Sequence, residues 1–120
     1  WKMPGDVFVF PHKFDGLSLP VQEALAAGMP LITTDMYPFN KWLPKEFLVE
    51  VDKTATIRLS REITASFVSP EALARRIDEW AGTDIESPSL AAGMLGEDLS
   101  WDKWLAPYED VIEQLCANEL

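Results

Sequence analysis

The sequence is poor in the residues that build disulfide-bonded and membrane-spanning proteins. It holds a single cysteine, Cys116, which cannot form a disulfide within the chain. This fits a reducing compartment, so we expect a cytoplasmic protein in which the thiol is buried or half-buried. No apolar run approaches the roughly 20 residues that a membrane-spanning helix needs.

Basic residues are also scarce. Lys and Arg total 10 against 20 Asp and Glu, which gives a net charge of −10. Nucleic acids and anionic membranes attract clustered cations, so neither is expected as the main partner. The acids are concentrated in the second half: residues 1–60 hold 7 acids and 6 bases (net −1), and residues 61–120 hold 13 acids and 4 bases (net −9). A phosphate-bearing ligand is therefore compatible with the first half.

The 120 residues, 48% of them apolar, suffice for one domain with its own core. We expect a single α/β domain over residues 1–120, with a sheet region at 1–68 and a helical tail at 69–120. The chain begins with Trp1 in place of Met and reaches its first apolar run within six residues. This predicts that the chain is a piece of a longer protein.

The first half predicts a strand–helix–strand unit. Residues 7–10 form an unbroken apolar run that is typical of a strand covered on both faces. Ser18 is positioned to cap a helix that runs to Ala27, and Gly28 follows where a left-handed cap belongs. Residues 31–35 then form a second strand. Tight connections of this kind predict parallel strands and a right-handed crossover.

Further elements are predicted along the rest of the chain. Residues 47–51 form a third strand, and the alternation over 55–60 predicts a fourth strand at the edge of the sheet, while 63–68 is ambiguous. Ser69 begins a helix that ends at Gly82. A short, weak helix follows Ser87-Pro88, since Gly93 and Gly96 lower its stability.

A last helix carries an apolar stripe at helical spacing, which we expect to join the core, with a kink or break at Pro107. The stripe consists of Trp101, Trp104, Leu105, Tyr108, Val111, Ile112 and Leu115.

The loop at residues 11–18 is the best candidate for a ligand site. In open α/β sheets, ligands bind beyond the carboxyl ends of the strands, where helix N-termini present free backbone N–H groups. His12 has no serine or cysteine nucleophile placed to use it, and Lys13 is expected to be a solvated loop lysine. Asp15, Glu23 and Asp35 lack an accompanying His or Cys, so no metal is expected.

The chain reads Asp-Val-Phe-Val-Phe-Pro at residues 6–11 and Asp-Gly-Leu-Ser-Leu-Pro-Val-Gln-Glu-Ala-Leu-Ala-Ala-Gly-Met-Pro at residues 15–30. These two stretches together resemble the donor-binding half of GT-B glycosyltransferases, the large retaining family that includes sucrose-phosphate, glycogen-type and mannosyl transferases. That family carries two acidic residues separated by seven others, then an Ala-rich helix ending in Gly-x-Pro, then a strand. Asp15 and Glu23 have this spacing, and Gly28-Met29-Pro30 follows. The likeness covers residues 6–52 well and the C-terminal helix more loosely.

The resemblance implies a fold and a site. The fold would be a partial Rossmann-like parallel sheet, the C-terminal half of GT-B, with trailing C-terminal helices. Asp15, as the catalytic residue, would meet the donor sugar together with Gly16 and Leu17. Glu23 would hold the ribose of the nucleotide, and the helix start at Ser18 would face the diphosphate. The donor is a nucleotide-sugar, and neither a cofactor nor a metal is expected.

The sequence departs from the family pattern in one residue and in its extent. The first acid is usually Glu, whereas Asp15 is one methylene shorter. The family's paired basic residues for the diphosphate, the upstream half of the donor domain and the acceptor-binding domain all precede this segment. We therefore expect the isolated chain to be inactive and to self-associate through an exposed sheet edge.

Two other interpretations stay open. A different nucleotide-binding α/β protein, such as a dehydrogenase fragment, is disfavoured because no Gly-x-Gly-x-x-Gly motif follows a strand. A non-catalytic, acidic interaction module on a degenerate transferase scaffold is the second alternative.

Overall fold

The computed structural model of the protein describes residues 6–118. Its centre is a three-stranded parallel sheet in the order β1-β2-β3, made by β1 (Phe8–Phe10), β2 (Leu31–Thr34) and β3 (Leu48–Val49). The predicted α/β class and parallel strands are thus confirmed. The third strand is shorter than the predicted 47–51, because η2 (Lys45–Phe47) turns the chain immediately before it.

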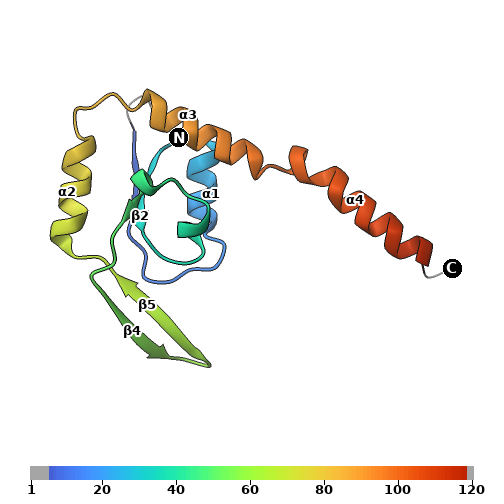
Figure 1. Ribbon diagram of the computed structural model, residues 1–120, viewed down its shortest axis with the longest axis horizontal. Helices are drawn as coiled ribbons and strands as arrows, with labels where there is room; N and C mark the ends of the chain where they lie inside the picture. Colours follow the sequence, from blue (N-terminus) through green and yellow to red (C-terminus); the bar gives the residue numbers. More distant parts are fainter. Residues whose placement is uncertain (1–5, 119–120) are drawn as a thin grey trace.

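Helices cover both faces of this sheet. α1 (Leu19–Ala26) lies on one face and α2 (Pro70–Trp80) lies on the other (Figure 1). Successive strand residues point to opposite faces, so Leu31 packs in the cluster of α1 and Ile32 packs with Ala72 of α2. All four residues of β2 are therefore buried.

α3 (Glu86–Asp98) is longer than the short, weak helix that the sequence predicts. It packs against α1 at unusually close range. A Cβ on Gly96 would lie 2.5 Å from the carbonyl oxygen of Leu25, and a Cβ on Gly93 would lie 3.7 Å from the Cα of Gly28. Gly93 and Gly96 lower the helix propensity of α3. Gly96, however, has no side chain, which permits the close contact between α3 and α1 that stabilises α3 in the folded chain.

The predicted fourth strand does not extend the parallel sheet. β4 (Lys53–Arg58) pairs antiparallel with β5 (Glu62–Phe67) in a separate two-stranded sheet. This hairpin projects from the body beyond the carboxyl ends of the parallel strands (Figure 1). The ambiguous stretch at 63–68 thus supplies the partner strand of β4. β4 pairs with this strand, its neighbour in sequence, and not with a strand of the parallel sheet.

α4 (Trp101–Asn118) departs from the prediction in two respects. The helix continues through Pro107, so no break occurs there. Its apolar stripe is exposed instead of joining the core, with every one of its seven residues at least 50% exposed. Cys116 on this helix is also exposed, contrary to the expected burial.

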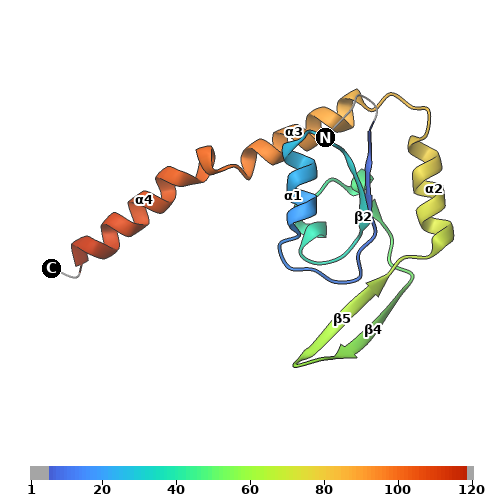
Figure 2. The same cartoon turned by 180° about the vertical axis from the view of Figure 1, so that it is seen from behind.

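The position of α4 explains this exposure. The helix extends away from the sheet and the other helices in both views (Figures 1 and 2). The radius of gyration is accordingly 17.7 Å, whereas a compact chain of this length has about 14 Å.

A chain truncated after Ser100 is expected to keep its fold. α4 contributes no buried side chain among its described residues, so its removal takes little apolar surface from the core. We predict a melting temperature within about 3 °C of that of the intact chain, which corresponds to less than about 1 kcal/mol. Thermal unfolding followed by circular dichroism measures this, and loss of cooperative unfolding would contradict the structure.

Candidate functional site

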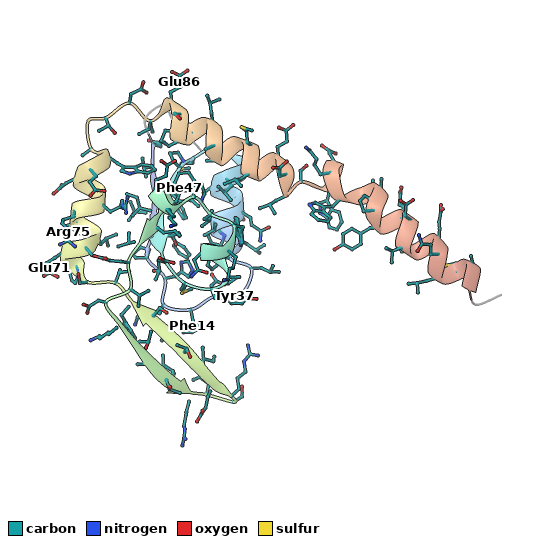
Figure 3. The ribbon with its side chains drawn as sticks, in the orientation of Figure 1. Phe14, Tyr37, Phe47, Glu71, Arg75 and Glu86 are labelled. Carbon is teal, nitrogen blue, oxygen red and sulfur yellow. The ribbon has the colours of Figure 1, made fainter. Side chains whose placement is uncertain are left out.

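The loop at residues 11–18 connects β1 to α1 beyond the carboxyl end of β1. Since the three strands are parallel, the segments that follow β1 and β2 leave the sheet at the same edge. Phe14 on the loop and Tyr37 after β2 both lie at this end of the body (Figure 3). The loop therefore has the location at which open α/β sheets bind ligands.

Two buried threonines of β2 fix the start of this loop. The hydroxyl of Thr33 donates to the carbonyl of Phe10 at 2.9 Å, and the hydroxyl of Thr34 donates to the carbonyl of His12 at 2.7 Å. Both threonines are at most 1% exposed. They hold the end of β1 and the second loop residue, His12, in place.

His12 is oriented by the same network. Its Nδ1 lies 3.1 Å from both the Phe10 carbonyl and Thr33 Oγ1. The carbonyl only accepts, and Thr33 already gives its proton to that carbonyl, so the network assigns the proton of a neutral ring to Nδ1. Nε2 is then an acceptor, and it is buried without a hydrogen-bond partner. The ring stands edge-on to Phe39, with centroids 4.9 Å apart.

Asp15 organises the turn that leads into α1. Its Oδ1 accepts hydrogen bonds from the backbone N–H groups of Gly16, at 2.7 Å, and Ser18, at 3.3 Å. These two N–H groups are therefore engaged, whereas the sequence predicts that they are free for a ligand. Among the described residues, the second carboxylate oxygen of Asp15 has no hydrogen-bond partner, and the residue is exposed.

Ser18 occupies the predicted N-cap position but does not cap through its side chain. Its carbonyl accepts from the N–H groups of Val21 and Gln22, at 3.1 and 3.2 Å. Its backbone is left-handed, with φ 46°, which turns the hydroxyl away from the usual capping geometry. Oγ is buried and has no partner. Ser69 at the start of α2 caps in the ordinary way, accepting from the Ala72 N–H at 3.1 Å.

Substitutions of these two serines are expected to have opposite effects. Ser18→Gly removes both a left-handed non-glycine residue and a buried unpaired hydroxyl, so it should stabilise the chain by about 1 kcal/mol. Ser69→Ala removes a working cap and should destabilise it by about 1 kcal/mol. Urea unfolding of the two variants measures this. A loss of stability in Ser18→Gly would show that the hydroxyl has a structural partner.

The rim of the loop combines an acid with exposed apolar side chains. Glu23 lies on α1 and is exposed, and no other described side chain bonds to it. Leu17 and Leu19 are 76% and 67% exposed, and Phe14 is 45% exposed. The amide of Gln22 donates to the Leu17 carbonyl at 2.7 Å and so fixes the loop against the helix.

Lys13 is engaged by the hairpin, a contact that the sequence does not indicate. Its ammonium lies 5.3 Å from the centroid of the Phe67 ring, within cation–π distance. Its carbonyl accepts from the Ser66 N–H at 2.7 Å. β5 therefore contacts the candidate loop through both the side chain and the backbone of Lys13. Only the pairing of β4 with β5 places Phe67 here, so no local pattern could have identified this contact.

Asp35 belongs to a different part of the surface. It lines a cleft of about 500 Å³ between α2 and the ends of β2 and β3, and no residue of the loop or of α1 lines that cleft. Within the described range, no three His, Cys, Asp or Glu side chains come together as a metal site would require. The structure thus brings Asp15 to Ser18 together, with Glu23 on the adjoining helix, and leaves Asp35 apart.

In residues 6–118 no helix is long and apolar enough to cross a membrane. A scan of family models, a search of curated proteins and a search of solved structures each found no match to this chain.

Proposed function

We propose that residues 11–23 form the nucleotide-sugar site of a retaining glycosyltransferase, in the Rossmann-like C-terminal half of a GT-B fold. One observation carries the proposal: Asp15 and Glu23, with the family spacing, lie on a loop and helix that follow the carboxyl end of a parallel strand. Two buried polar atoms without partners, His12 Nε2 and Ser18 Oγ, lie at the two ends of that loop segment.

The chemistry of these groups suits a donor rich in hydroxyl groups. Carboxylates accept from hydroxyls, so the second oxygen of Asp15 would receive a sugar hydroxyl and Glu23 would receive the ribose hydroxyls. The start of α1 at Ser18 would face the diphosphate with the positive end of the helix dipole. The protein's share of catalysis would be to orient the donor and to stabilise the charge that develops on the departing diphosphate.

The remainder of the enzyme would be contributed by an upstream part of a longer protein. That part would hold the acceptor domain and the basic residues for the diphosphate, and the chain alone would be inactive. β1 lies at one edge of the sheet, so upstream strands, or a second copy of the chain, would pair there. No metal or cofactor takes part in this proposal, and a cytoplasmic location agrees with the single cysteine.

A second candidate function is a non-catalytic interaction module on the same scaffold. The exposed stripe of α4 favours it, because contiguous exposed apolar surface is typical of protein interfaces. Under this alternative Glu23 and Asp15 would bind no donor.

Thermal stabilisation by donors distinguishes these functions. A ligand at about five times its Kd stabilises the folded state by about 1 kcal/mol, or about 4 °C. We expect UDP-glucose, GDP-mannose or ADP-glucose to produce this shift and NAD to produce none. No shift with any of the three sugar nucleotides would favour the interaction module, and a shift with NAD alone would favour a dehydrogenase fragment.

A further inference from the structure

The cleft beside α2 concentrates positive charge in an acidic protein. Four of the ten Lys and Arg residues of the chain line it: Lys41, Lys45, Arg75 and Arg76. Three acids, Asp35, Glu50 and Glu79, also line it, which leaves a local balance of +1 in a chain of net charge −10. Its volume of about 500 Å³ lies within the range of small-molecule sites.

The cations differ in how firmly they are held. Arg75 pairs with Glu50 at 3.4 Å and Arg76 pairs with Glu79 at 3.3 Å. Arg75, Glu50 and Glu79 are exposed and Arg76 is half-buried. Long ion pairs with exposed partners are weak, so a bound anion can replace them at little cost. Neither Lys41 nor Lys45 forms an ion pair with any of residues 6–118. The two lysines therefore provide uncompensated charge at the cleft.

The rest of the lining is suited to a polar molecule with an apolar ring face. Leu48, Val49 and Ala72 are buried residues that line the cleft. Asp35 and Asn40 are exposed beside them and can accept from or donate to hydroxyl groups. Arg75, labelled in Figure 3, belongs to α2, the helix that forms the other wall of the cleft from Asp35 and Asn40.

We propose that this cleft binds a small phosphorylated molecule that carries hydroxyl groups. The phosphate lies against Lys41 and Lys45, and the guanidinium groups of Arg75 and Arg76 supply further donors to it. The hydroxyl-bearing part lies over Leu48 and Val49 with Asp35 beside it. The site shares no residue with the loop at 11–18, so it stands whether or not that loop binds a nucleotide-sugar.

The test is a titration of the full chain followed by amide chemical shifts. The probes are glucose 6-phosphate, glucose and inorganic phosphate. We expect glucose 6-phosphate to shift amides in residues 35–50 and 72–79 and to bind at least tenfold more tightly than glucose or phosphate. The double variant Lys41→Ala/Lys45→Ala should weaken its binding at least tenfold.

A control variant separates a built site from general attraction to charge. Lys53→Ala/Arg61→Ala removes the same two charges from exposed positions on the hairpin and should change the affinity less than twofold. Equal losses in the two double variants would overturn the proposal, as would shifts elsewhere in the chain. Inorganic phosphate binding as tightly as glucose 6-phosphate would also overturn it, because only an adventitious ion would then be bound.

Discussion

Gly96→Ala is expected to unfold about 10 °C below the wild-type chain, a loss of about 2 kcal/mol. An added Cβ would lie 2.5 Å from the oxygen and 2.6 Å from the carbon of the Leu25 carbonyl, and 2.7 Å from the nitrogen of Ala26. All three are backbone atoms of α1, which cannot turn aside as a side chain can. α3 would have to move away from α1, and Ala92, fully buried on α3, would lose contacts in the core.

Gly93→Ala is the matched control on the same helix. Its Cβ would lie 3.7 Å from the Gly28 Cα, which is an ordinary van der Waals contact. Since alanine favours a helix over glycine by about 1 kcal/mol, this variant should be as stable as the wild type or more stable. Calorimetric unfolding of both variants measures the contrast. Equal stability of the two would mean that α3 does not approach α1 at Gly96.

Glu23→Ala is expected to weaken binding of the preferred sugar nucleotide at least tenfold, or about 1.4 kcal/mol. The residue is exposed and bonds to no other described side chain, so its removal should leave the fold unchanged. Under the proposed function, the substitution removes the carboxylate that accepts hydrogen bonds from the ribose hydroxyls. Binding constants from calorimetric titration of the wild type and the variant provide the comparison.

Glu113→Ala is the charge-matched control for this experiment. It removes the same side chain from the exposed face of α4, away from the loop, and should leave the donor affinity unchanged. If Glu23→Ala also binds the donor like the wild type, Glu23 has no part in the site. If both variants weaken binding equally, the effect is one of net charge.

The strand–helix–strand unit could be predicted because its signals are local. The apolar run of β1, the all-buried β2 and the left-handed Gly28, at φ 64°, each depend on neighbouring residues. The hairpin could not be assigned to its sheet in the same way. Alternation predicts a strand at 55–60 but does not say which strand it pairs with.

In the candidate site, too, some features have local sequence signals and others depend on the folded structure. Its location and residues follow from motif spacing, whereas the bonds of Asp15 to the loop N–H groups and the left-handed turn at Ser18 depend on loop geometry. The apolar stripe of α4 predicts a helix that packs in the core, because such a stripe usually lies against another element. Periodicity shows that a helix has an apolar face, but it does not show whether the chain supplies the surface that covers it.

Amide chemical-shift mapping of the chain with UDP, GDP and ADP, each with and without an attached sugar, tests the central proposal most directly. The proposed function predicts that one nucleotide at millimolar concentration shifts the amides of residues 12–23, with the attached sugar adding shifts at Asp15, Gly16 and Leu17. Shifts confined to the cleft beside α2, or no response to any of the three nucleotides, would contradict a donor site on this loop.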